Sequence, residues 1–242
     1  MKQSRFDIVS NSPVALNTFK MLLRGDCSGF TAPGQFINIR IDGFFLRRPI
    51  SVYDFGDGCV SIVYRVAGRG TEALSRLSHG SLDLLLPLGN GFDVSKAGKH
   101  SLLLGGGVGS APLHALAKAL AGAGKRVTAV MGFNSAAEVF GEEELARAGA
   151  EVIICTLDGS RGEKGYVTGP MQGLDYDMFY ACGPEPMLRA VEKTAVSDGQ
   201  FSFEERMGCG FGACMGCSCE TKYGAKRICR DGPVLNREEI IW

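Results

Sequence analysis

Four cysteines near the end of the chain have a spacing that iron-sulfur chemistry uses. Cys209, Cys214 and Cys217 lie in the segment CGFGACMGC, separated by four and then two residues, and Cys229 follows after eleven more. Two short gaps and a distant fourth cysteine match the ligand pattern of plant-type 2Fe–2S clusters. The intervening glycines allow the chain to wrap closely, so that backbone amides can point at sulfur and offset the negative charge of the cluster. The sequence therefore predicts a one-electron carrier held by these four cysteines.

Disulfide bonds and a structural zinc ion are the alternatives for these cysteines. The N-terminal segment MKQSRFDIVSNSPVAL lacks the apolar stretch and cleavage site of a signal peptide, so we expect a cytoplasmic protein, whose thiols stay reduced. The cysteine count, nine, is also odd. Zinc sites usually combine two close ligand pairs, and Cys229 has no second ligand nearby in the sequence. Cys219 would share a face with Cys217 in an extended segment, but the 2Fe–2S spacing leaves it out, so we predict a non-ligand.

A glycine-rich turn in the middle of the chain has the features of a phosphate-binding loop. In LLLGGGVGSAP, Gly105, Gly107 and Gly109 stand between an apolar strand and a helix that begins near Pro112. Glycines let backbone amides approach a diphosphate, whose charge the helix N-terminus favours. Pro112 replaces the last glycine of the usual dinucleotide fingerprint, so a plain tight turn between strand and helix remains an alternative.

A second turn of this kind follows a later strand. In YACGPEP, Cys182 and Gly183 end an apolar strand and open another helix. Because α/β sheets bind ligands at the carboxyl ends of their strands, we expect both turns to face one crevice. Cys182 is a candidate catalytic residue in that crevice, and its alternative is a buried small hydrophobic residue.

Two segments in the first hundred residues indicate a second phosphate-binding region. LRRPISVY places a guanidinium beside a rigid proline and a hydroxyl, which suits a phosphate. VYRVAGRGT ends at the start of a predicted helix, whose amides can take another side of a diphosphate. The candidate residues are Arg48, Pro49, Ile50, Ser51, Val63, Tyr64, Arg65, Gly70 and Thr71. A solvated arginine pair and an edge-strand tyrosine are the alternatives.

The elements that position these residues change type along the chain. Residues 1–98 show short alternating segments, such as Val60, Ile62, Tyr64 and Val66, which predict an antiparallel β barrel with one helix over 71–78. Residues 99–206 alternate apolar runs, at 102–104, 127–131, 152–155 and 178–181, with helical patterns, which predict a doubly wound parallel α/β domain. Residues 207–242 form a small Cys- and Gly-rich module that is too short for its own apolar core, so we expect a cluster at its centre.

The overall composition excludes some classes of partner. Lys plus Arg and Asp plus Glu each total 26, and neither sign forms long runs. A nucleic-acid surface or a polybasic membrane anchor would show such runs. No segment offers about 18 uncharged apolar residues for a membrane span. We expect neither nucleic acid nor membrane as a partner.

Together, the motifs resemble those of the ferredoxin reductase family, in which a flavin-binding barrel precedes a nicotinamide-nucleotide domain. The flavin motif of that family, Arg-x-x-Ser or Thr, matches residues 48–51. Its Gly-x-Gly-x-x-Pro motif matches Gly107, Gly109 and Pro112, and its Cys-Gly-Pro motif matches residues 182–184. The agreement in order and spacing extends over the whole chain.

One branch of the family is more similar than the others. RRPIS, GRGTEAL, LLLGGGVGSAPL, LDGSRGEKGYVT and CRDGPVL resemble segments of the electron-transfer subunits of NAD-dependent (class B) dihydroorotate dehydrogenases. That resemblance implies FAD on the barrel and a 2Fe–2S cluster on the four cysteines named above. It also implies a heterotetramer with a separate FMN-containing catalytic subunit, from which electrons run through the cluster and FAD to NAD⁺ in pyrimidine (UMP) biosynthesis.

Two other functions stay open at the level of sequence. The same domain plan serves NAD(P)H-ferredoxin oxidoreductase subunits, some of which replace the fourth cysteine ligand with a carboxylate, whereas all four positions here are cysteine. A degenerate reductase acting as a scaffold or redox sensor is the non-enzymatic alternative. We expect NAD rather than NADP, because Asp158 follows a strand and would repel a 2′-phosphate, although Arg161 lies nearby.

Overall fold

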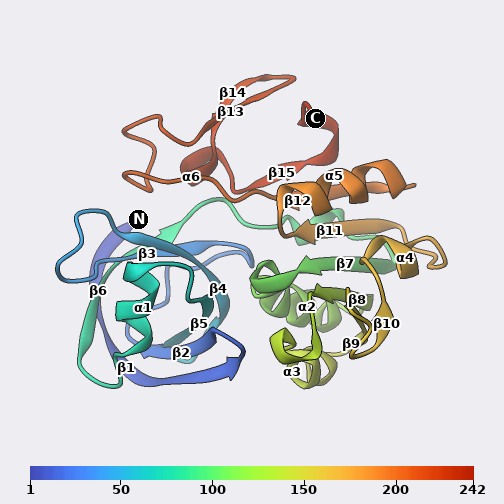
Figure 1. Ribbon diagram of the computed structural model, residues 1–242. Helices are drawn as coiled ribbons and strands as arrows, with labels where there is room; N and C mark the ends of the chain where they lie inside the picture. The colour runs from blue at the N-terminus through green and yellow to red at the C-terminus, as the bar shows by residue number, and fades with distance from the viewer.

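The computed structural model describes all residues 1–242, which form a β barrel beside an α/β domain (Figure 1). The barrel occupies the left of the view, the α/β domain the right, and the last forty or so residues, in orange and red, cross the top of both. Both predicted fold classes are therefore confirmed. No helix is long and apolar enough to cross a membrane.

The barrel is closed by six antiparallel strands in the order β1-β2-β5-β4-β3-β6. Alternation points one side of each strand inward, as in β6, where Leu82, Leu84, Leu86 and Leu88 are buried and the residues between them are not. Closure leaves the barrel without a free sheet edge. The strands are β1 (Lys2–Ala15), β2 (Thr18–Arg24), β3 (Phe36–Ile39), β4 (Arg48–Gly56), β5 (Cys59–Arg65) and β6 (Ser81–Leu88).

One helix, α1 (Arg69–Ser75), follows β5. The predicted helix began at Thr71 and ended at Ser78, so the observed helix begins two residues earlier and ends three earlier. The reason for the early start is Thr71 itself, whose hydroxyl accepts hydrogen bonds from the amides of Ala67 and Gly68 at 2.9 and 3.2 Å. Its side chain caps the helix from inside the first turn rather than preceding it.

The α/β domain is built on a seven-stranded sheet in the order β10-β9-β8-β7-β11-β12-β15. All neighbouring strands are parallel except β15, which runs antiparallel to β12 at one edge. The strands are β7 (His100–Gly106), β8 (Arg126–Phe133), β9 (Ala150–Thr156), β10 (Glu163–Lys164), β11 (Met178–Cys182), β12 (Asp198–Ser202) and β15 (Val234–Asn236). The four predicted strands are β7, β8, β9 and β11.

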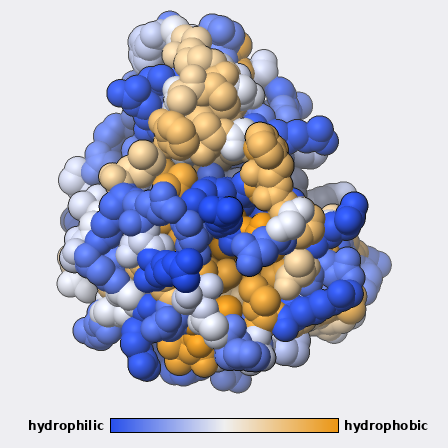
Figure 2. Space-filling model, turned by 90° about the vertical axis from the view of Figure 1, so that its left-hand side faces the viewer, coloured by the Kyte–Doolittle hydropathy of each residue, from blue (hydrophilic) through white to orange (hydrophobic).

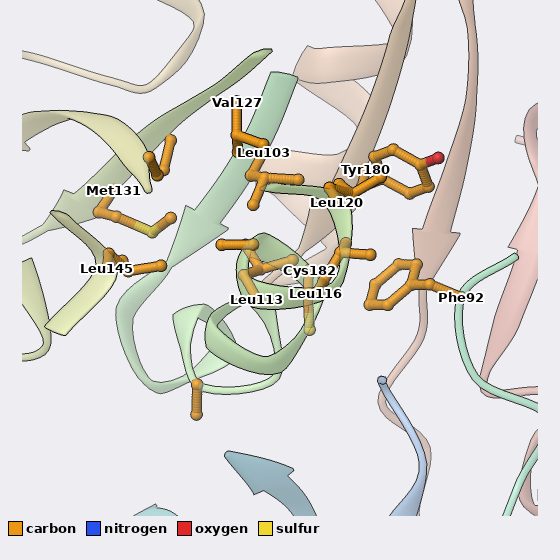
Figure 3. Packing of buried hydrophobic residues seen from close by; sticks show 14 of the residues in the cluster. Phe92, Leu103, Leu113, Leu116, Leu120, Val127, Met131, Leu145, Tyr180 and Cys182 are labelled. Atoms are coloured by element: carbon orange, nitrogen blue, oxygen red, sulfur yellow. The ribbon is translucent and has the colours of Figure 1, made fainter. Parts of the chain in front are cut away.

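Helices cover both faces of this sheet. The apolar face of α2 (Leu113–Gly122) is buried, and Figure 3 shows Leu113, Leu116 and Leu120 against strand residues such as Leu103 and Val127. α3 (Glu142–Arg147) packs on the same face, whereas residues of α4 (Thr168–Met171) and α5 (Glu185–Thr194) pack on the other. Short 3₁₀ helices lie at η1 (Val94–Lys96), η2 (Gly107–Ser110), η3 (Ala136–Glu138) and η4 (Arg237–Glu239).

The C-terminal segment shares the core of the α/β domain instead of having a cluster as its only support. Cys217, Ile228 and Leu235 belong to one hydrophobic cluster with Leu102 and Phe179 of the sheet. The segment contains a hairpin of β13 (Ser218–Thr221) and β14 (Gly224–Arg227), the short helix α6 (Ile228–Asp231) and then β15. The sequence predicted a segment too short for its own apolar core, and the structure shows that the sheet edge at β12 supplies apolar surface to it.

Candidate cofactor sites

The four candidate ligands lie as two pairs. The amide of Cys214 donates to the Sγ of Cys209 at 3.5 Å, and the amide of Cys229 donates to the Sγ of Cys217 at 3.4 Å. No three ligand side chains converge as a single metal ion would require. Two pairs suit a binuclear cluster, in which each of the two irons takes two of the four thiolates.

Backbone amides are directed at the first pair. The amides of Phe211, Ala213 and Cys214 all donate to the Sγ of Cys209, at 3.5, 3.3 and 3.5 Å. Burial raises the pKa of Cys209, but these amides outweigh it and lower the pKa to about 6. The donors thus favour the thiolate, which is the form that binds iron. This is the amide arrangement that the glycine-rich sequence predicted.

Two glycines make this wrapping possible. Gly210 has φ +78°, and a Cβ there would lie 2.3 Å from the side-chain nitrogen of Asn38. Gly212 has φ +91°, and its Cβ would lie 2.8 Å from the Cδ of Arg230. Only glycine adopts such backbone angles freely and leaves room for these neighbours.

The second pair is more deeply buried than the first. Cys217 and Cys229 are only 3% and 1% exposed, whereas Cys214 is exposed. Burial and then the neighbouring Cys217 raise the pKa of Cys229 to about 12. Iron coordination would deprotonate such a thiol outright. Cys219 lies on β13, outside both pairs, and lines a different cavity with Glu205 and Trp242.

The predicted flavin residues surround a cavity of about 320 Å³ between the barrel and the α/β domain. Arg48 is next to this cavity and contacts Gly70. A Cβ on Gly70 would lie 2.3 Å from the Nε of Arg48. This close approach brings a guanidinium and the first turn of α1 together, which suits a diphosphate. The predicted residues that line the cavity are Pro49, Ile50, Ser51, Val63, Tyr64, Arg65 and Thr71, and Pro112 lines it from the other domain.

The cluster loop and the flavin motif are separated by one strand. Asn38 of β3 donates from its side chain to the carbonyl of Cys209 at 3.2 Å. Asn38 pairs in the barrel with Pro49 of β4. Neighbouring strands lie about 4.8 Å apart. All four residues of β3 are buried, because the C-terminal segment contacts the face of the strand that carries Asn38.

The nucleotide loop borders a larger cavity of about 550 Å³. Gly107 and Gly109 line it from the loop after β7, and Gly183 lines it from the loop after β11. A Cβ on Gly109 would lie 2.7 Å from the Cα of Gly183 and 2.9 Å from the carbonyl of Cys182, so the two loops touch through their backbones. Gly105, near the end of β7, packs closely against the same loop: a Cβ on it would lie 2.5 Å from the Oγ of Ser110.

Comparisons with known proteins agree with this geometry. Residues 204–241 match the family described as the iron-sulfur cluster binding domain of dihydroorotate dehydrogenase B. The chain is 41% identical over 258 residues to the "Dihydroorotate dehydrogenase B (NAD(+)), electron transfer subunit" of Geobacillus sp. strain WCH70, covering all of this chain and 99% of the relative. It is 42% identical over 255 residues to the protein of the same name in Bacillus velezensis, covering 99% of each. The chain belongs to the family of dihydroorotate dehydrogenase B electron transfer subunits.

Solved structures show the same fold. The NADH-dependent reduced ferredoxin-NADP oxidoreductase structure superimposes with a TM-score of 0.89 at 30% identity, covering 98% of this chain and 90% of that one. The ferredoxin reductase in carbazole 1,9a-dioxygenase superimposes with a TM-score of 0.68 at 22% identity, covering 80% and 65%. The first matches the chain nearly end to end, and the second shares the fold alone.

Cys182, the candidate catalytic residue, lies in the hydrophobic core of the α/β domain. Its side chain is 1% exposed and belongs to the core beneath the sheet, where Figure 3 shows it beside Leu113 and Leu116. Burial raises the pKa of its thiol to about 12. The placement corresponds to the alternative considered from the sequence, a buried small hydrophobic residue at a strand end.

Asp158 and Arg161, the residues that bear on nucleotide choice, follow β9. The carboxylate of Asp158 accepts hydrogen bonds from the hydroxyl and amide of Ser160 at 2.6 and 2.9 Å, which lower its pKa. Arg161 forms an ion pair with Glu142 of α3. Arg161, the cation near Asp158 that could favour a 2′-phosphate, is therefore paired with a carboxylate of its own.

Glu204 is a site residue that the sequence reasoning missed. It follows β12 and lines both the flavin cavity and the nucleotide cavity. Burial raises the pKa of its carboxyl. Its position could have been inferred from the rule that α/β sheets bind ligands beyond the carboxyl ends of their parallel strands. The sequence did not indicate the preceding strand, because DGQFS, with three polar residues and a glycine, lacks the apolar run typical of a buried strand.

Proposed function

We propose that this chain carries electrons from dihydroorotate, oxidised on a partner catalytic subunit, to NAD⁺, by way of a 2Fe–2S cluster and FAD. When bound, the cluster supplies one-electron transfer, and FAD converts it to the two-electron hydride chemistry of the nicotinamide. The family membership and the three adjacent candidate sites support the proposal. The assignment of individual residues below is part of it.

In this account the cysteine pairs hold the cluster at the surface and the barrel holds FAD beneath it. The pairs Cys209 with Cys214 and Cys217 with Cys229 would supply the four thiolates that hold the cluster. Arg48 and the start of α1 neutralise the flavin diphosphate. The loops at Gly107, Gly109 and Gly183 bind the NAD diphosphate through their amides.

The observation that carries the proposal is the short path from cluster loop to flavin motif. Asn38 contacts Cys209 on one side and pairs with Pro49 on the other. Met207 and Glu205, just before the first ligand, line the flavin cavity directly. A single barrel strand, β3, therefore connects the cluster loop with the flavin motif. Both candidate sites are formed by secondary structure or by packed loops.

The partner is proposed to dock over the cluster loop. Figure 2 shows hydrophobic surface gathered at the top of the molecule, over the cysteine-bearing segment. Cys214 is exposed there, and Phe211 and Met215 are 41% and 54% exposed. Apolar surface beside an electron carrier marks a protein interface. We propose that the partner is an FMN-containing catalytic subunit, since oxidation of dihydroorotate releases two electrons and the cluster accepts one. We also propose a cytoplasmic heterotetramer of two copies of each chain, as the resemblance to the family implies.

The proposal is tested by co-purifying the chain with its neighbours and titrating the complex anaerobically. NADH should reduce the visible absorbance of both flavin and cluster in the wild-type complex. In Cys217→Ser it should reduce the flavin alone. A complex that contains no dihydroorotate-oxidising flavoprotein, or whose cluster NADH leaves oxidised, would contradict the proposal.

A further inference from the structure

Tyr53 and His114 join the two cofactor-binding segments across the domain boundary. Tyr53 of β4 lies two residues beyond Ser51 of the flavin motif, and His114 of α2 lies two residues beyond Pro112 of the nucleotide loop. Their rings stack with centroids 4.3 Å apart and planes 11° apart. The stack therefore fixes the spacing between two short segments that approach different cofactors.

Glu144 of α3 and Lys20 of β2 complete this contact. Tyr53 donates its hydroxyl to the carboxylate of Glu144. The ammonium of Lys20 donates to both oxygens of that carboxylate at 2.9 and 2.7 Å, and lies 4.5 Å from the centre of the Tyr53 ring. Two side chains come from the barrel and two from the α/β domain. We call Lys20, Tyr53, His114 and Glu144 the interdomain clamp.

The protonation states of the clamp suit a permanent contact. Burial, followed by the carboxylate of Glu144, raises the pKa of Tyr53 well above its usual range, so its hydroxyl remains a donor. Burial raises the pKa of Glu144, but Lys20 and Tyr53 outweigh it and lower the pKa overall. Glu144 therefore stays ionised as the acceptor at neutral pH.

None of the four clamp residues lines the flavin cavity or the nucleotide cavity. Any effect of the clamp residues on the reaction would therefore come from how they position the two cofactor-binding segments. Hydride transfer needs the reacting atoms about 3–3.5 Å apart, and a displacement of about 1 Å can cost about a hundredfold in rate. β4 carries the flavin motif and α2 follows the nucleotide loop, so the contact between these two elements bears on that distance.

We propose that the interdomain clamp positions the nucleotide loop against the flavin motif for hydride transfer. The inference rests on the proposed function, because it assumes that NADH and FAD exchange a hydride between these two segments. It adds positioning residues that touch neither cofactor.

The test compares Tyr53→Phe and Glu144→Gln with Glu143→Gln in the complete complex. Glu143 neighbours Glu144 on α3, but its side chain is 90% exposed and pairs only with Arg147. Stopped-flow reduction of FAD by saturating NADH gives the hydride-transfer rate, and NADH titration gives the dissociation constant. We expect the rate to fall about tenfold to a hundredfold in both clamp variants, with the dissociation constant and FAD content unchanged, and no effect in Glu143→Gln.

A second readout is independent of turnover. The amide of Leu16, in the turn after β1, donates to the carbonyl of Ala137 across the domain boundary at 2.8 Å. Its hydrogen exchange reports opening of the interface. Exchange at Leu16 should become faster in Tyr53→Phe and Glu144→Gln but not in Glu143→Gln.

The clamp is refuted if both clamp variants keep the wild-type rate, or if the rate falls only in proportion to lost FAD or NADH affinity. Unchanged exchange at Leu16 in both variants would also refute it. Failure of the proposed function is a different result: the wild-type complex would contain no dihydroorotate-oxidising flavoprotein, or NADH would leave its cluster oxidised. The clamp also falls if NADH does not reduce the flavin of the wild-type complex.

Discussion

The backbone amide of Cys229 donates to the Sγ of Cys217 at 3.4 Å, although eleven residues separate the two cysteines. The hairpin of β13 and β14 lies between them and returns the chain to its starting point. Arg227, at the end of that hairpin, donates to the carbonyl of Gly212 at 3.0 Å and so connects the second pair to the loop that carries the first. The most distant ligand is thus positioned by ordinary secondary structure.

The pairing predicts different outcomes for two nearby cysteines. Cys217→Ser should remove nearly all 2Fe–2S absorbance and bound iron, because it breaks one of the two pairs. Cys219→Ser should retain both, because that side chain lies outside the pairs. Visible absorbance together with iron and sulfide analysis of the two purified variants measures this. The reverse result would require a different ligand set.

Gly70 offers a test of the flavin site with a matched control. A Cβ at Gly70 would lie 2.3 Å from the Nε of Arg48, so Gly70→Ala must displace the guanidinium. Losing a hydrogen bond to a charged group costs about 1.5–3 kcal/mol, which corresponds to a loss of FAD affinity of about tenfold to a hundredfold.

The control for Gly70 is Gly68→Ala, since a Cβ at Gly68 meets nothing within 4 Å and its backbone is extended. FAD retained after dialysis, measured by absorbance, should fall in Gly70→Ala and not in Gly68→Ala. Equal retention by the two variants would remove Arg48 from the flavin site.

The motifs were accessible from the sequence because each lies at the boundary of an element with a clear pattern. The apolar strand before Gly105 and the apolar helix face after Pro112 fixed the place of the nucleotide loop, and both were observed. The cysteine spacing likewise predicted which thiols come together. Local patterns therefore sufficed for the loops and for the order of the domains.

What the sequence could not predict depends on contacts between distant segments. Strand β12 has a polar, glycine-containing sequence, and it is buried only because β11 and β15 flank it. Asn38 reads as an outward residue of a barrel strand, yet it is 1% exposed because the cysteine loop covers it. The stack of Tyr53 on His114 joins two domains and leaves no signal in the spacing of either segment.

Gly109 provides the corresponding test of the nucleotide site. Its Cβ would lie 2.7 Å from the Cα of Gly183, so Gly109→Ala must push the two loops apart. The displaced amides would lose a hydrogen bond to the charged diphosphate, which costs about 1.5–3 kcal/mol, so NADH should bind about tenfold to a hundredfold more weakly, as measured by titration of the complex.

The control for Gly109 is Gly122→Ala at the end of α2, where a Cβ meets nothing within 4 Å. Gly122→Ala should bind NADH as the wild type does, and FAD content should be unchanged in both variants. Wild-type affinity in Gly109→Ala would mean that NADH binds elsewhere.

Asp158 predicts the choice of nucleotide. Hydrogen bonds from Ser160 lower the pKa of its carboxyl, so the group is ionised throughout the neutral pH range and repels a 2′-phosphate there. NADH should therefore reduce the flavin much faster than NADPH, by stopped-flow absorbance, and the preference should weaken only in acid. Asp158→Asn should narrow the ratio about tenfold or less, with the NADH rate preserved. Equal wild-type rates with the two nucleotides would overturn the prediction.

The central claim is that electrons from dihydroorotate reach NAD⁺ through this chain. The most direct measurement mixes dihydroorotate and NAD⁺ anaerobically with the co-purified complex and follows orotate and NADH together. We expect one NADH for each orotate in the wild-type complex. When the complex carries Cys217→Ser, we expect at most one orotate for each FMN of the partner, since the reduced FMN then has no acceptor, and no NADH. NADH formation at the wild-type rate by the Cys217→Ser complex, or by the partner subunit alone, would contradict the claim.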